Sequence, residues 1–132
     1  MLAKPILQEL RDIVGKDRCL TAPEDLLVYS HDVFAEKKPD VVVLPTTTEE
    51  VCRVMRVADR EKIPVTPRGS ATGLTGMCVP QRGGIVLAMS RMNRILEISP
   101  EDRLAIVEPG VITQDLQQAA EARGVFYPPD PA

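Results

Sequence analysis

Residues 41–76 read VVVLPTTTEEVCRVMRVADREKIPVTPRGSATGLTG, and they carry the clearest pattern of strands and helices in the chain. Val41–Leu44 is a continuous apolar run between two prolines, which is typical of a short strand buried on both faces. A capping box at Thr47–Glu50 and apolar residues at helical spacing after it predict a helix to about Lys62. Ile63–Pro67 is a second short strand candidate. The order strand, helix, strand predicts a βαβ unit with a right-handed crossover and a parallel pair of strands.

The segment before this unit is mainly helical. Lys4–Gly15 carries an apolar stripe with a proline near its start, and it predicts the first helix. A second short helix follows Thr21, which we expect to be its cap, with Pro23 in its first turn. Phe34–Asp40 is mostly polar and predicts a connection. We therefore expect an N-terminal helical segment over residues 1–39.

Beyond Gly84 the pattern changes to short strands separated by turn residues. The strand candidates are Ile85–Met89, Ile95–Ile98 and Leu104–Val107. Thr113 is the expected cap of a helix that runs through Arg123, with Gly124 after its end. A parallel unit followed by these strands predicts the α+β class, with residues 40–132 as the N-terminal part of one larger domain.

Composition narrows the class of protein. The chain has 132 residues, 44% of them hydrophobic and 27% charged, which are ordinary values for a globular domain. The net charge is −3 and there is no basic stripe, so we expect no nucleic-acid partner. The apolar runs are too short for a transmembrane segment, and the N-terminus lacks the apolar core of a signal peptide. These features predict a cytoplasmic protein.

The sequence offers no set of metal ligands. The three cysteines, Cys19, Cys52 and Cys78, are widely spaced and form no CxxC pair, and His31 is the only histidine. We expect the cysteines to be reduced and partly buried, and His31 to be structural or exposed.

The stretch PRGSATGLTG, at Pro67–Gly76, directly follows the second strand of the βαβ unit. Its small residues leave consecutive backbone N–H groups free to turn inward and bind an anion. Hydroxyl groups in the stretch and the charge of Arg68 add to its attraction for phosphate. The glycine spacing fits neither GxGxxG nor a P-loop. The residues alone leave open both a phosphate loop and an ordinary tight loop.

Five motifs in order make the chain recognisable: VVVLPTTTEEV, PRGSATGLTG, RMNRIL, VEPGV and YPPDP. They resemble the flavin-binding region of the FAD-linked oxidases, the family of p-cresol methylhydroxylase and vanillyl-alcohol oxidase. Within it, Tyr29 through Ala132 most resembles the glycolate oxidase FAD subunit and the D-lactate and D-2-hydroxyglutarate dehydrogenases. The resemblance implies the type-2 FAD-binding fold, in which FAD lies between a parallel subdomain with flanking helices and an antiparallel one.

The resemblance also implies the site. The loop would wrap the FAD pyrophosphate, Pro45 would lie near the adenine end, and the turn at residues 129–131 would approach the flavin. The implied cofactor-binding residues are Pro45, Pro67, Arg68, Gly69, Ser70, Ala71, Thr72, Gly73, Leu74, Thr75, Gly76, Cys78, Pro109, Gly110, Pro129 and Asp130. No catalytic base is nominated. Arg68–Gly76 contains no histidine or cysteine for a covalent flavin link, so we expect FAD to bind non-covalently.

Two departures from the family qualify this expectation. Met77 stands where the family often has glycine, so its side chain must point away from the cofactor. The family continues past the PDP turn with a flavin-lining segment and a substrate domain, whereas this chain ends at Ala132. We therefore expect the FAD-binding portion of an enzyme that oxidises a 2-hydroxy acid by hydride transfer to FAD, inactive by itself. Its electron acceptor stays open, and partner subunits or self-association are expected. The alternatives are a non-catalytic nucleotide- or phosphate-binding module, or a same-fold UDP-sugar enolpyruvyl reductase or alcohol oxidase.

Some charged residues fit two roles. Glu108 fits a carboxylate near the cofactor or, more commonly, a solvated strand end. Arg91 and Arg94 fit a phosphate contact or, more commonly, a solvated turn. Tyr29 and Asp32 are expected to serve packing.

Overall fold

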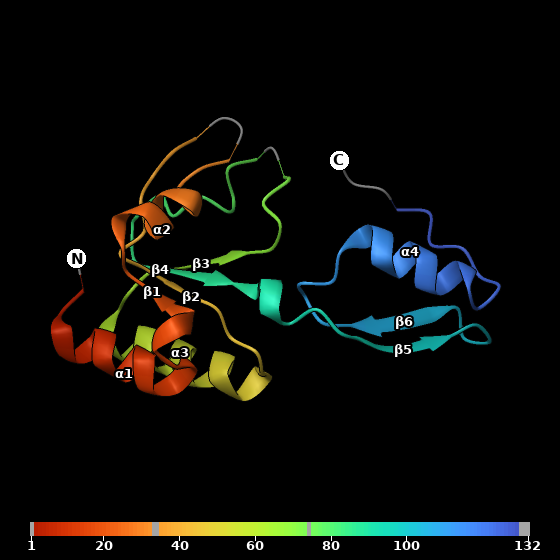
Figure 1. The fold of residues 1–132 in the computed structure, drawn as a ribbon, viewed down its shortest axis with the longest axis horizontal. Helices are drawn as coiled ribbons and strands as arrows, with labels where there is room; N and C mark the ends of the chain where they lie inside the picture. Colours follow the sequence, from red (N-terminus) through yellow and green to blue (C-terminus); the bar gives the residue numbers. More distant parts are fainter. Residues whose placement is uncertain (1, 33–34, 74, 130–132) are drawn as a thin grey trace.

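The structure is a computed structural model that describes residues 2–32, 35–73 and 75–129. These residues form an α+β fold with two units side by side (Figure 1). The first unit comprises α1 (Lys4–Val14), η1 (Lys16–Arg18), β1 (Cys19–Leu20), α2 (Pro23–Val28), β2 (Val41–Val43), α3 (Thr48–Glu61), β3 (Val65–Arg68), β4 (Ile85–Ala88) and η2 (Met89–Arg91). The second comprises β5 (Ile95–Ser99), β6 (Leu104–Val107) and α4 (Thr113–Glu121).

The sheet of the first unit has the strand order β1-β2-β4-β3. β2 and β3 each pair with β4 in parallel, so the direct β2–β3 pairing expected from the sequence is wrong. The burial of the strands explains the order. All of Ile85–Ala88 is buried, which suits a central strand, whereas β3 contains the exposed Pro67, which suits an edge strand.

β1 was not expected from the sequence. It pairs with β2 antiparallel, with Cys19 opposite Val43. A strand of two residues is too short to show an alternating pattern, and only its tertiary pairing defines it.

Helices cover both faces of this sheet (Figure 1). On one face, α1 and α3 bury Leu10, Val14 and Val54 against Val41 and Ile85. On the other, Val42 and Val86 pack with Leu20, Leu26 and Tyr29. The alternation of the β2 side chains between two apolar clusters explains why its sequence is continuously apolar.

The ends of the helices follow the expectations in part. Thr47 caps α3 by accepting a hydrogen bond from the Glu50 backbone N–H at 3.2 Å, as predicted. The predicted cap of α2 is wrong, because Ala22 precedes that helix without a side-chain hydrogen bond. The predicted cap Thr113 is instead the first residue of α4, which ends at Glu121. At the starts of α2 and α4, the residue before the helix has an extended backbone, and the helix begins without a side-chain cap.

In the second unit, β5 and β6 form an antiparallel pair in which Ile95 is opposite Val107 and Ser99 is opposite Leu104. α4 lies beside the hairpin (Figure 1). Its buried residues Leu116 and Ala120 line a pocket together with Ile98 and Leu104 of the hairpin. All four residues of β6 are exposed.

A close backbone contact joins the two units. Gly110 donates a hydrogen bond to the Met92 carbonyl at 2.8 Å, and a Cβ at Gly110 would overlap the Met89 carbonyl oxygen. Only glycine permits this approach.

Phe34, in the predicted connection, lies outside the described residues. No helix in residues 2–32, 35–73 and 75–129 is long and apolar enough to cross a membrane.

Candidate cofactor site

The glycine-rich loop begins where β3 ends. β2, β3 and β4 are parallel, so their carboxyl ends lie at one edge of the sheet. The arrows of β3 and β4 point toward the second unit, and the loop rises from this edge (Figure 1). Ligands of open parallel sheets bind outside the carboxyl ends of the strands. The loop therefore occupies the position where a cofactor is expected.

The loop surrounds a hollow of about 210 Å³. The hollow is lined by Gly69, Ala71, Thr72, Gly73, Thr75, Met77 and Cys78. A Cβ at Gly69 or Gly73 would meet no atom within 4 Å. Ala71 and Gly76 have positive φ angles of 61° and 73°, the left-handed conformation that also occurs in anion-binding backbone turns.

The side chains of the loop leave it accessible. Ser70, Thr72 and Thr75 are exposed, so their hydroxyl groups are available as donors. Leu74 lies outside the described residues. Met77 borders the hollow and is 81% exposed, and the orientation of its side chain away from a bound cofactor stays a prediction.

Arg68 holds the base of the loop. It is only 9% exposed, and its Nη1 donates to the carbonyl oxygens of His31 at 3.0 Å and Cys78 at 3.4 Å. Its guanidinium also lies 5.7 Å from the ring centroid of Tyr29, which gives Tyr29 the packing role expected of it. Arg68 thus ties both ends of the loop to the segment after α2. These bonds leave no signal in the sequence, because the nearer partner, Cys78, is ten residues away from Arg68.

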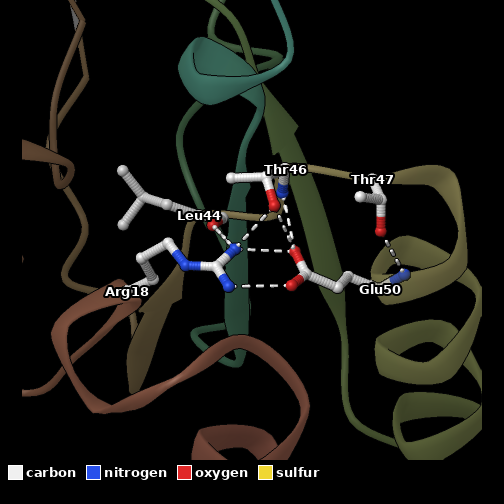
Figure 2. Close-up of polar contacts among 5 residues, drawn as sticks. All are labelled: Arg18, Leu44, Thr46, Thr47 and Glu50. Atoms are coloured by element: carbon white, nitrogen blue, oxygen red, sulfur yellow. Dashed lines mark hydrogen bonds and ion pairs between the residues drawn. The ribbon is translucent and has the colours of Figure 1, made fainter.

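The turn between β2 and α3 lies at the same edge of the sheet, and it contains the predicted site residue Pro45, which is fully buried. Figure 2 shows that Arg18, from η1, binds this turn together with Glu50. The Arg18 guanidinium beside Glu50 lowers the pKa of this carboxyl to about 2. The capping role of Thr47 follows from local spacing, whereas the contact with Arg18 bridges residues far apart in the sequence.

The burial of Glu108 contradicts the expectation that this residue is a solvated strand end. It is 7% exposed and accepts hydrogen bonds from Arg94 through the backbone N–H at 2.8 Å, Nε at 3.1 Å and Nη2 at 2.6 Å. The Arg94 guanidinium lowers the pKa of the Glu108 carboxyl. Arg94 was expected to lie in a solvated turn. It is largely exposed, but it also forms an ion pair with Glu108 across the hairpin. This pair closes β5 onto β6 next to Pro109 and Gly110.

The remaining predicted residues are less gathered. Pro67 and Pro109 are exposed, and the Pro129 carbonyl accepts a hydrogen bond from the Gln117 amide at 3.2 Å. Asp130 lies outside the described residues.

Cys52 is exposed, so partial burial holds only for Cys19 and Cys78. Among the residues that the structure describes, no group of three His, Cys, Asp or Glu side chains is arranged to hold a metal.

Comparison with known proteins identifies the family. A model of the FAD-binding domain matches residues 39–132. The chain belongs to this FAD-binding family. It is 40% identical over 134 residues to the glycolate oxidase subunit GlcD of Bacillus subtilis (strain 168), covering 100% of this chain and 28% of that protein. It is 37% identical over 129 residues to a D-lactate dehydrogenase of Anaerostipes hadrus, covering 96% of this chain and 27% of that enzyme.

Solved structures agree on the fold. A substrate-bound p-cresol methylhydroxylase superposes with a TM-score of 0.75 at 25% identity, over 92% of this chain and 25% of that one. An alkyldihydroxyacetonephosphate synthase superposes with a TM-score of 0.86 at 21% identity, over 99% of this chain and 27% of that one. The expected type-2 FAD-binding fold and FAD as cofactor are confirmed. This chain spans little more than a quarter of the curated relatives described above.

Proposed function

We propose that this chain provides the pyrophosphate-binding part of a flavin oxidoreductase that oxidises a 2-hydroxy acid. Relatives over nearly the whole chain are named a glycolate oxidase subunit, a D-lactate dehydrogenase and a D-2-hydroxyglutarate dehydrogenase, which supports this substrate class. When bound, FAD supplies the acceptor for the hydride of the hydroxy acid. The residues of this chain bind and orient it.

The open hollow at the glycine loop is the observation that carries the proposal. Backbone N–H groups of residues 69–76 receive the pyrophosphate, because no side chain at Gly69 or Gly73 obstructs them. Hydroxyl groups of Ser70, Thr72 and Thr75 donate to the phosphate oxygens. Arg68 keeps the loop ends together and adds positive charge at its base.

The other site residues bind the parts of the cofactor on either side of its pyrophosphate. Pro45, in the β2–α3 turn, lies toward the adenine. Pro109, Gly110 and Pro129 lie toward the flavin, and Cys78 borders the pyrophosphate. Asp130, outside the described residues, is assigned to the flavin end by the family resemblance alone. Residues 40–132 form the FAD-binding part and residues 1–39 precede it.

Binding is non-covalent in this proposal. No histidine or cysteine stands in Arg68–Gly76. Acid precipitation of the FAD-loaded protein should release all flavin to the supernatant, and flavin retained in the pellet would contradict it.

The setting of the enzyme is also part of the proposal. The glycolate oxidase relative is named a subunit, which supports partner subunits. Free thiols are typical of proteins in a reducing compartment, so the three free cysteines support a cytoplasmic location.

Substitution of Gly73 by valine tests the role of the loop. The added side chain meets no protein atom near its Cβ, so the fold is retained, but it occupies the space of the pyrophosphate. We expect FAD to bind the intact protein about tenfold more weakly, a change of about 1.4 kcal/mol, with unchanged far-UV circular dichroism. Gln81→Val is the control, because Gln81 is exposed in the same β3–β4 connection but outside the hollow. Unchanged FAD affinity in Gly73→Val would show that the loop does not contact the cofactor.

The substrate class has its own test. The FAD-loaded intact protein is mixed anaerobically with glycolate, D-lactate or D-2-hydroxyglutarate, and bleaching of the flavin absorbance is followed. At least one acid should reduce the flavin. If none does while FAD remains bound, the substrate class is wrong and the binding role of the loop is unaffected.

A further inference from the structure

The β2–α3 turn is held by an arginine that lies outside the matched family region. Arg18 belongs to η1, whereas the FAD-binding family match begins at residue 39. Its Nη1 donates to the Leu44 carbonyl at 3.4 Å and to Thr46 Oγ1 at 3.0 Å. In return, the Leu44 backbone N–H donates to the Arg18 carbonyl at 2.9 Å. One residue therefore binds the turn through both its backbone and its side chain.

Glu50 completes the arrangement from the first turns of α3. Its Oε2 and Oε1 accept from Arg18 Nη1 at 2.7 Å and Nη2 at 2.8 Å, a two-pronged ion pair (Figure 2). The same carboxylate accepts from the Thr46 backbone N–H at 2.7 Å and from its hydroxyl at 3.1 Å. The side chains of Arg18 and Glu50 are 29% and 15% exposed, so water screens this pair less than a surface pair.

This network fixes the turn in one conformation. Every polar group of Thr46 that faces the network is bonded, and Pro45 between Leu44 and Thr46 is fully buried. Removing the guanidinium would leave the Glu50 carboxylate and the Leu44 carbonyl short of donors, and the turn would have to rearrange to reach water.

The location of the turn connects it to the cofactor. The loop after β3 and the turn after β2 lie at the same edge of the sheet, with β4 between them. Neighbouring strands lie about 4.8 Å apart, so β2 and β3 are about 10 Å apart where the turn and the loop begin. That separation suits one nucleoside arm of a dinucleotide whose pyrophosphate lies on the loop. The turn offers the exposed hydroxyl residue Thr47 and no cation of its own, which suits a neutral base and its ribose.

We propose that Arg18 is a positioning residue for FAD, which holds the β2–α3 turn in the shape that receives the adenylate half of the cofactor. This rests on the proposed function, in which the glycine loop binds the pyrophosphate. The N-terminal segment, outside the matched family region, then contributes to cofactor affinity without touching the cofactor.

The experiment compares binding of FAD and FMN to the intact apoprotein, since FMN carries the flavin and a phosphate but no adenylate. Arg18→Met keeps the apolar stem and removes the guanidinium. We expect it to raise the FAD dissociation constant about tenfold and that of FMN less than about twofold. Arg18→Lys, which keeps the charge but loses the two-pronged pairing, should restore part of the FAD affinity. Arg60→Met is the control, because it removes an exposed ion pair with Glu9 between α1 and α3 and should change neither constant.

The outcomes separate the inference from the proposed function. Equal weakening of FAD and FMN by Arg18→Met, or no weakening of FAD, would overturn the positioning role. Gly73→Val in the same assay reports on the loop independently, so the proposed function stands or falls by that variant. If Arg18→Met does not fold, Glu50→Gln gives the same readout, because the amide keeps the shape of the carboxylate and loses its charge.

Discussion

Glu50 is the residue whose charge links pH to stability most directly in this chain. The Arg18 guanidinium and the Thr46 hydrogen bonds lower the pKa of this carboxyl from 4.5 to about 2. A carboxyl with a lower pKa in the folded state stabilises the fold above its unfolded pKa. That stability is lost as the pH falls from about 4.5 toward 2.

Glu50→Gln should therefore flatten the acid side of the stability curve. We expect the variant to be less stable than the wild type at pH 7 by about 2 kcal/mol, the scale of a hydrogen bond to a charged group. The difference should shrink as the pH is lowered to 2. Urea unfolding at several pH values measures it. A difference that is the same at pH 7 and pH 2 would contradict the ion pair.

Residue-level roles could be predicted from the sequence only where the partners are close in the chain. The Thr47 cap of α3 follows from a three-residue spacing. The contacts of Arg18 with Glu50 and of Arg68 with His31 span 32 and 37 residues, so they require the fold. The burial of Glu108 was missed because its partner Arg94 reaches it only across the β5–β6 hairpin.

At the scale of elements, the junction between η2 and the turn after β6 joins the two units. The sequence marks it as a motif, VEPGV, without showing its structural cause. The cause is the approach of Gly110 to the carbonyl oxygens of Met89 and Met92.

Gly110→Ala should destabilise the chain by about 1–3 kcal/mol, the cost of forcing an atom into packed space. The added Cβ would lie 2.8 Å from the Met92 carbonyl oxygen and closer still to that of Met89. Gly69→Ala is the matched control, because its Cβ meets no atom within 4 Å. Thermal unfolding of the two variants gives the comparison. Equal melting temperatures would show that the junction accommodates a Cβ at residue 110 without loss of stability.

The elements themselves could largely be predicted, but their order in the sheet could not. Apolar runs located β2 and β4, and helical spacing located α1 and α3. The insertion of β4 between β2 and β3 depends on which strand is buried on both faces, and burial is a property of the assembled sheet. The type-2 FAD-binding fold was reached through the order of five motifs, whereas the local patterns predicted only its class.

At the scale of the whole molecule, the second unit exposes much apolar surface. Leu96, Leu104, Ile106, Val107 and Phe126 are exposed on or beside the β5–β6 hairpin. An isolated pair of strands with an open edge is a template for pairing with another chain. In the first unit, large apolar residues are exposed on α2 (Leu27 and Val28), on α3 (Met55) and in the β3–β4 connection (Met77).

The 132-residue chain by itself should therefore self-associate. Because it spans little more than a quarter of its relatives, we also expect it to bind FAD weakly and to oxidise none of the three hydroxy acids. Sedimentation at increasing concentration measures the association. Ile106→Lys, on β6, should reduce it, whereas Val28→Lys, an equally drastic change on exposed α2, should not. A chain that stays monomeric at all concentrations, or that turns over D-lactate with a dye acceptor, would contradict this account of the second unit.

In the proposed function, the glycine loop at the carboxyl end of β3 receives the FAD pyrophosphate. The most direct measurement is a titration of the ¹⁵N-labelled chain with FAD, followed by the amide resonances, which detects even weak binding at each backbone N–H. We predict that the amides of Gly69, Gly73 and Gly76 shift most, while those of Cys52 and Arg60 on the outer side of α3 stay in place. Saturating FAD that leaves the loop amides unmoved, or that shifts the α3 amides instead, would contradict the claim.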